Sequence, residues 1–114
     1  MRRVTPKAFP DEPLLQDAAA VAEFIRAART QGGLTLEEAA LITGIAKSTM
    51  QKLETTPGSV GFATVLHVAR ELGVSLFAFP AEQRERVRRL TARRVASEAD
   101  GSVSQGPMTG ADQP

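Results

Sequence analysis

The sequence predicts an all-α fold, a compact bundle of helices, and two observations lead to this prediction. Hydrophobic residues make up 42% of the chain but aromatic residues only 4%, and there is no Trp or Tyr. Alanine and aliphatic side chains must therefore fill the core, and cores rich in alanine favour closely packed helices. Apolar residues also recur at spacings of three and four, in runs that glycines end. With 114 residues, the chain is about the size of one domain.

The first two helices are expected between residues 17 and 44. Asp17 is a suitable N-cap for the first, and the glycines after residue 31 end it. Thr35 and Glu38 have the spacing of a capping box, which would start the second helix and stabilise it by about 1 kcal/mol. Gly44 marks the end of this second helix.

Two more helices are expected at residues 47–54 and 62–72. The first of these is short and polar, with Met50 and Leu53 spaced three apart. The second has an apolar stripe and ends at Gly73. His67 falls off that stripe, so it is expected to face solvent on the helix surface.

The expected organisation has a central domain with polar segments on both sides. Residues 1–16 contain three prolines and should form a flexible arm, and residues 17–79 should form the folded domain. Residues 80–96 should form a basic, arginine-rich segment that is helical from residue 81, and residues 97–114 a disordered tail.

An apolar run at residues 75–79 precedes Pro80, and its periodicity leaves open whether it forms a helical turn or a short strand. Its large apolar side chains make it a candidate contact in a dimer. The residues that would contribute are Leu76, Phe77 and Phe79.

Composition argues against several classes of function. The chain has no cysteine and one histidine, so disulfides, thiolate sites and a histidine metal site are not expected, and no cofactor is predicted. Catalysis is not expected either, because the sequence shows no cluster of histidine, paired carboxylates or glycine-rich phosphate loop. No run of 18 apolar residues occurs, so the expected location is the cytoplasm, without a membrane contact.

Residues 34–54 have the pattern of a helix-turn-helix. Ala40 is small where two helices would cross, Gly44 permits the turn, and Ile45, Met50 and Leu53 would anchor the second helix. The outward face of that helix lacks acidic residues and is rich in hydrogen-bond donors, which suits phosphate oxygens and base edges. An ordinary polar helix in a small bundle is the alternative. The outward residues are Lys47, Ser48, Thr49, Gln51 and Lys52.

From about Val21 to Phe79 the sequence resembles the phage-repressor type of helix-turn-helix domain, the Cro-like or XRE family. The resemblance is carried by IRAAR, GLTLEEAALITGIAKSTMQKLE and VARELGVSL. It implies a lambda-repressor-like bundle of about five helices that binds double-stranded operator DNA as a homodimer.

The resemblance also implies roles for individual residues. Lys47, Ser48 and Lys52 match base-reading positions of the family, whereas Thr49 and Gln51 would support them or touch the DNA backbone. Thr35, at the start of the preceding helix, is a further DNA-binding candidate. An ion pair that would fix the recognition helix is implied between Arg29 and Glu54.

Three positions depart from the family pattern. Leu36 replaces a glutamine that commonly touches phosphate, and Ala46 replaces the usual serine or threonine N-cap of the recognition helix. Leu41 stands at a position that is usually polar and exposed. Docking of Leu14 and Leu15 or local repacking would explain the two leucines, and a partner site is the alternative.

The segment from Leu53 to Phe79 also resembles HipB-type antitoxins, in which a short strand pairs with its copy in a dimer. This narrower resemblance implies that the protein could bind a toxin partner and repress its own operon. The predicted function is thus a dimeric, sequence-specific transcriptional repressor, and the alternative is an antitoxin or protein-interaction module.

Arginines after the domain supply a second source of positive charge. Arg86, Arg89 and Arg93 share a helical face and could follow the phosphates of flanking DNA. A solubilising helix exposed to water would show the same pattern, and the sequence leaves both readings open.

Overall fold

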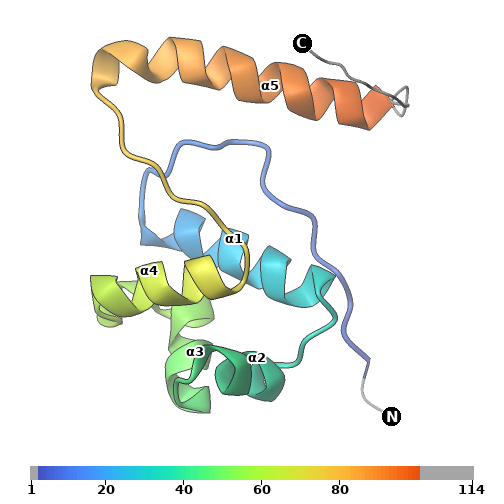
Figure 1. The fold of residues 1–114 in the computed structure, drawn as a ribbon, viewed down its shortest axis with the longest axis vertical. Coiled ribbons are helices and arrows are strands. Elements are labelled where there is room, and N and C mark those ends of the chain that lie inside the picture. Colours follow the sequence, from blue (N-terminus) through green and yellow to red (C-terminus); the bar gives the residue numbers. More distant parts are fainter. Residues whose placement is uncertain (1–2, 101–114) are drawn as a thin grey trace. The chain divides into compact units, whose positions relative to one another are not determined.

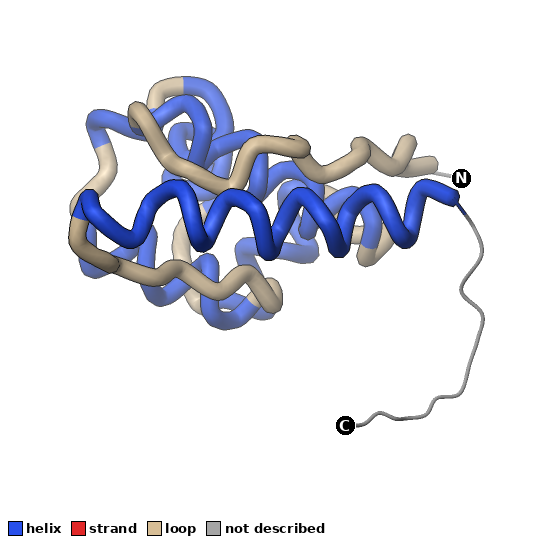
Figure 2. Tube along the Cα trace, turned by 90° about the horizontal axis from the view of Figure 1, so that it is seen from above, coloured by secondary structure: helices blue, strands red, loops and turns tan. Residues whose placement is uncertain are grey.

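The computed structural model describes the backbone of residues 3–100 and the side chains of residues 3–92. Within this part of the chain the fold is all-α, as predicted, and Figure 2 shows helices joined by loops. The α-helices are α1 (Ala18–Gln31), α2 (Leu36–Thr43), α3 (Lys47–Thr55), α4 (Phe62–Glu71) and α5 (Arg84–Asp100). Short 3-10 turns at Pro57–Ser59 and Ala81–Gln83 precede α4 and α5.

The chain divides into two compact units. The first contains the residues up to Pro10 together with Leu14–Ala78, and the second contains Asp11–Pro13 together with the chain from Phe79 onward. Helices α1 to α4 gather into one bundle in the first unit (Figure 1). The helix-turn-helix predicted from the sequence thus lies within a single packed body.

Local signals place the helix ends in the first unit. The Asp17 carboxylate accepts a hydrogen bond from the Ala20 amide at 3.0 Å and caps α1. Both bonds of the capping box are present at α2, because the Glu38 amide donates to Thr35 Oγ1 at 3.1 Å and the Thr35 amide donates to Glu38 Oε1 at 2.8 Å. The capping box therefore starts α2 where the sequence predicted.

The core of the first unit lies where α1, α2, α3 and α4 meet. Ile25, Met50, Leu53 and Val68 are its largest fully buried side chains. Ala39 and Ala40 are buried among them, and their small size lets α2 approach its neighbours closely. Each helix contributes its apolar stripe, as the spacing of three and four predicts.

Residues 3–17 form no helix or strand, but three interactions tie this segment to α1. The Lys7 amide donates to Thr30 Oγ1 at 2.9 Å, and the Gln31 side chain donates to the Lys7 carbonyl at 2.9 Å. The rings of Phe9 and Phe24 pack in a tilted arrangement, with 6.1 Å between their centroids. Residues 7–9 are therefore held against the domain at both main-chain and side-chain atoms.

Helix α5 differs in its ends from the helix expected at residues 81–96. A 3-10 turn occupies Ala81–Gln83, the α-helix begins at Arg84, and it continues to Asp100 rather than stopping at residue 96. The sequence after residue 96 contains no proline or glycine before Gly101, so nothing local ends the helix earlier. The predicted tail beyond Asp100 lies outside the described residues.

Residues 75–79 form neither a helix nor a strand in the single chain. A strand that pairs with a second copy remains a prediction, because its hydrogen-bond partners would belong to that copy. Within the described residues, no helix is both long enough and apolar enough to cross a membrane.

Candidate DNA interface

The turn between α2 and α3 has the geometry that the sequence predicts. Gly44 adopts a left-handed conformation with φ of 76°, which a residue with a side chain tolerates poorly. The amides of Gly44 and Ile45 both donate to the Ala40 carbonyl, at 2.8 and 3.1 Å. Met50 and Leu53 are fully buried, so one face of α3 packs against the core. The opposite face of α3 is left for other contacts.

The outward face of α3 carries the residues predicted to bind DNA. Lys47, Ser48, Gln51 and Lys52 are exposed, and Thr49 is half-buried. Thr35 is half-buried as well, and its hydroxyl oxygen is engaged in the capping box of α2. The hydroxyl proton of Thr35 can still be donated to a phosphate oxygen.

Lys47 has a carboxylate beside it. Its Nζ lies 3.2 Å from Glu37 Oε2, and both side chains are about half exposed. An ion pair in contact with water is weak and is screened by salt. DNA phosphates would therefore compete with Glu37 for the Lys47 ammonium group.

The N-terminus of α3 has no side-chain cap. Ala46 occupies the N-cap position in extended conformation, and no side chain bonds to the first amides of the helix. The sequence predicted this gap, with Ser48 or water as substitutes, and the Ser48 hydroxyl does not fill it. Amides at a helix N-terminus without a side-chain cap are suited to receive a phosphate group.

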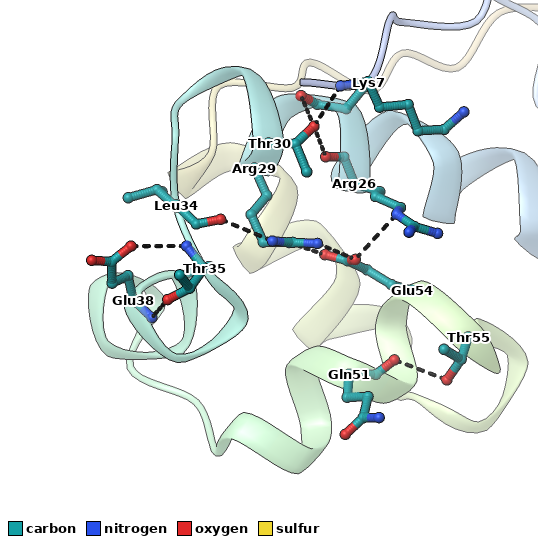
Figure 3. A network of polar contacts seen from close by, with 12 residues as sticks. Lys7, Arg26, Arg29, Thr30, Leu34, Thr35, Glu38, Gln51, Glu54 and Thr55 are labelled. Atoms are coloured by element: carbon teal, nitrogen blue, oxygen red, sulfur yellow. Dashed lines mark hydrogen bonds and ion pairs between the residues drawn. The ribbon is translucent and has the colours of Figure 1, made fainter. Parts of the chain in front are cut away.

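The other end of α3 is held by a network of charged side chains (Figure 3). Arg29 Nε donates to Glu54 Oε2 at 2.6 Å, and its Nη2 donates to Glu54 Oε1 at 2.9 Å. Its Nη1 donates to the Leu34 carbonyl at 2.8 Å. Arg29 is only 8% exposed, and Arg26 adds a second cation 4.0 Å from the same carboxylate. This pair joins α1, the loop before α2, and α3.

The positions that depart from the family pattern behave differently from one another. Leu36 is partly buried and packs against the core, so repacking explains it. Leu41 is 82% exposed, and its neighbour Ile42 is also exposed. Of the two leucines that depart from the family pattern, Leu36 is thus covered by the core, and Leu41 is left exposed.

Sequence reasoning missed the contact made by His67. The residue is exposed, as expected, and its Nε2 also lies 2.7 Å from the Thr43 carbonyl at the end of α2. The two residues are 24 positions apart, so no local pattern signals the contact. His67 does lie off the apolar stripe of α4, as predicted, and the end of α2 lies on that side of α4.

The arginines of α5 belong to the second unit. Arg86 and Arg89 are exposed there, and the Arg93 side chain lies outside the described residues. Arg88 Nη2 lies 3.5 Å from Glu12 Oε1 in the same unit. Two of the three predicted phosphate contacts are thus open to solvent within this unit.

The candidate dimer residues have unequal exposure. Phe77 is 81% exposed, whereas Leu76 and Phe79 are half-buried. The described residues contain no group of three or more His, Cys, Asp or Glu side chains placed to bind a metal ion. The chemistry available at α3 is hydrogen bonding by hydroxyl, amide and ammonium groups.

Comparison with protein-family models gives a match over residues 25–79 to the helix-turn-helix family. Residues 25–79 are therefore similar to helix-turn-helix domains. Domains of this type are DNA-binding regulatory domains. The match begins in α1 and ends beyond α4, so it includes the whole helix-turn-helix and the Arg29–Glu54 pair.

Solved structures share the fold of this helix-turn-helix domain. A structure described as MDT Protein is 24% identical, with a TM-score of 0.55 over 60% of this chain and 96% of that one. A HipB variant in complex with an O2 20mer is 24% identical, with the same TM-score over 60% of this chain and 94% of that one. A HipA-HipB-O2-O3 complex contains a chain that is 22% identical, again with a TM-score of 0.55, over 60% of this chain and 96% of that one. No curated protein matches the sequence.

Proposed function

We propose that the protein is a sequence-specific transcriptional repressor that binds operator DNA as a dimer and reads it with residues 47–54. The observation that carries this proposal is the two-sided construction of α3. Met50 and Leu53 are fully buried on one side of α3, and the exposed side carries hydroxyl, amide and ammonium donors without a carboxylate. Such donors can bond to the acceptor oxygens of backbone phosphates and to the acceptor edges of guanine bases in the major groove.

The base-reading roles belong to this proposal. Lys52 and Ser48 are exposed on α3, and each would contact one base pair, whereas Thr49 and Gln51 would support them or touch the backbone. We expect Lys52→Ala and Ser48→Ala each to lower discrimination at one base position by about 1–3 kcal/mol. Selection of binding sites from random DNA, carried out with the full chain and each variant, measures this change.

Arg89→Ala is the matched control for these substitutions. Arg89 is exposed on α5, so its loss should weaken binding to all sequences alike and flatten the dependence of affinity on salt. The proposal of specific repression is wrong if the wild-type protein selects no preferred half-site. The assigned base contacts are wrong if Lys52→Ala and Ser48→Ala leave the selected sequence unchanged.

The proposed dimer would form through the end of the first unit. Phe77 is 81% exposed and follows an open groove of about 310 Å³ beside α4, whose apolar lining includes Leu66, Val74 and Leu76. Burial of these side chains against a second copy would remove apolar surface from water. A dimer of this family would place its two recognition helices about 34 Å apart, on half-sites separated by one turn of DNA.

A second candidate function is that of an antitoxin, and the exposed apolar residues of α2 favour it. Leu41 and Ile42 are consecutive exposed residues of α2, the first helix of the helix-turn-helix. One structure with this fold contains HipA together with HipB. Co-purification of this protein with the product of an adjacent gene would support the antitoxin function, and a protein that purifies alone from cells expressing both genes would argue against it.

The proposal does not include catalysis. Ser48 is exposed and Thr49 is half-buried at the start of α3, and the one histidine of the chain is engaged with the Thr43 carbonyl. A nucleophilic hydroxyl needs a base within hydrogen-bond reach. The arrangement therefore fits binding through hydrogen bonds better than bond making.

A further inference from the structure

The end of α2 is held from outside by a side chain of α4. Thr43 is the last residue of α2, and its carbonyl is among the groups that a helix cannot satisfy internally. His67 Nε2 lies 2.7 Å from this carbonyl oxygen. A carbonyl only accepts hydrogen bonds, so the imidazole must carry its proton on Nε2 and donate.

Other groups near the turn cannot replace this contact. The Thr43 hydroxyl points back along its own helix and donates to the Ala39 carbonyl at 2.8 Å. The amides of Gly44 and Ile45 are both used by the Ala40 carbonyl. The His67 side chain is therefore the donor that the structure supplies to the last carbonyl of α2.

Packing fixes the position of His67 on its helix. Val65 and Val68 lie within two residues of it in the sequence, and both are buried in the core. The backbone of α4 cannot rotate without removing these side chains from the core. The imidazole is thus presented to α2 by a rigid element, although His67 itself is exposed.

The turn that follows Thr43 determines the direction of the recognition helix. Only Gly44, Ile45 and Ala46 separate α2 from α3, and the first turn of α3 lacks a side-chain cap. A shift of the Thr43 carbonyl would move the start of α3, where Lys47 and Ser48 lie. The contact from α4 holds the α2 side of this turn.

We propose that His67 is a positioning residue for DNA recognition, which holds the turn between α2 and α3 so that Lys47 and Ser48 meet the correct bases. The role in DNA reading rests on the proposed function. The positioning itself does not, because it is a property of the free protein. Two measurements on the full chain separate the two parts.

The first measurement is hydrogen exchange of backbone amides in the free protein. His67→Leu removes the donor, and His67→Gln places an amide Nε2 the same number of bonds from the backbone. With His67→Leu, the amides of Gly44, Ile45 and Met50 should exchange about three to ten times faster, the change that matches one net hydrogen bond. Amides in the middle of α1 should be unchanged, and His67→Gln should restore rates near those of the wild type.

The positioning role is wrong if His67→Leu leaves exchange at the turn unchanged. It is also wrong if exchange rises equally in α1, because the histidine would then stabilise the whole domain rather than the turn. Equal rates in His67→Gln and His67→Leu would overturn it too. Glu71→Gln, an exposed substitution on the same helix, is the control and should leave all these rates as they are.

The second measurement is the ratio of affinities for a selected site and for random DNA. His67→Leu should lower this ratio about three- to tenfold with little change in affinity for random DNA, and His67→Gln should restore it. An unchanged ratio, or equal loss on both DNAs, would overturn the role in recognition. A wild-type protein without a preferred site would instead refute the proposed function, and hydrogen exchange would still decide whether His67 positions the turn.

Discussion

The two ends of the recognition helix α3 are held in contrasting ways. At its C-terminal end, Glu54 accepts two hydrogen bonds from a guanidinium that is only 8% exposed, and Arg26 adds a second cation. At its N-terminal end, no side chain caps the helix, and the nearest ion pair, between Lys47 and Glu37, is open to water. The C-terminal end of α3 is thus anchored by buried charges, whereas its N-terminal end has only a solvent-exposed ion pair beside it.

Breaking the rigid end should have the largest effect. Arg29→Met leaves the Glu54 carboxylate nearly buried without its main partner, so we expect the free energy of unfolding to fall by about 3–5 kcal/mol. Urea denaturation followed by circular dichroism measures this loss. The double variant Arg29→Met with Glu54→Met, which removes both charges, should recover most of it. A single variant as stable as the wild type would contradict the anchoring role of the pair.

Adding the missing cap at the other end should have an effect of intermediate size and of opposite sign. Ala46 already has the extended conformation of an N-cap, with φ of −67° and ψ of 147°. Ala46→Ser can therefore bond to a free amide of α3 and should raise the free energy of unfolding by about 1 kcal/mol. The same denaturation experiment detects it, and Ala46→Val, which adds bulk without an oxygen, should give no gain. Equal effects of Ser and Val would show that the amides do not need a cap.

The smallest change in stability is expected for the surface pair beside α3. Glu37→Gln should change the free energy of unfolding by less than about 1 kcal/mol, because the pair with Lys47 is half exposed. It should raise DNA affinity at low salt, since Lys47 no longer has a competing carboxylate, and this gain should disappear as salt is added. Titrations of DNA binding at several salt concentrations measure it. A larger gain with the distant Glu71→Gln would remove the special role of Glu37.

The sequence predicts those parts of the fold that depend on neighbouring residues. Thr35 and Glu38 are three apart, so their capping box is visible in the sequence, and so is the spacing of Met50 and Leu53 that buries α3. The uncapped start of α3 follows directly from the methyl side chain of Ala46. Each of these features needs only the few residues within one turn of a helix.

Contacts between distant residues could not be predicted in this way. His67 meets the Thr43 carbonyl and the Lys7 amide meets Thr30 across more than twenty positions, and neither partner belongs to a recognisable pattern. The Arg29–Glu54 pair also joins distant positions, and only the family resemblance pointed to it. The different exposure of Leu36 and Leu41 could not be predicted either, because it depends on which face of α2 meets the core.

The attachment of the N-terminal segment affects how this domain can be cut out for separate study. Sequence patterns place the start of the domain at Asp17, and a fragment that begins there would lack Lys7 and Phe9. Thr30 would lose the amide that donates to its hydroxyl, and Phe24 would lose its aromatic neighbour. Thr30 directly follows Arg29 in α1, so a fragment trimmed at Asp17 would be altered beside the residue that anchors the recognition helix.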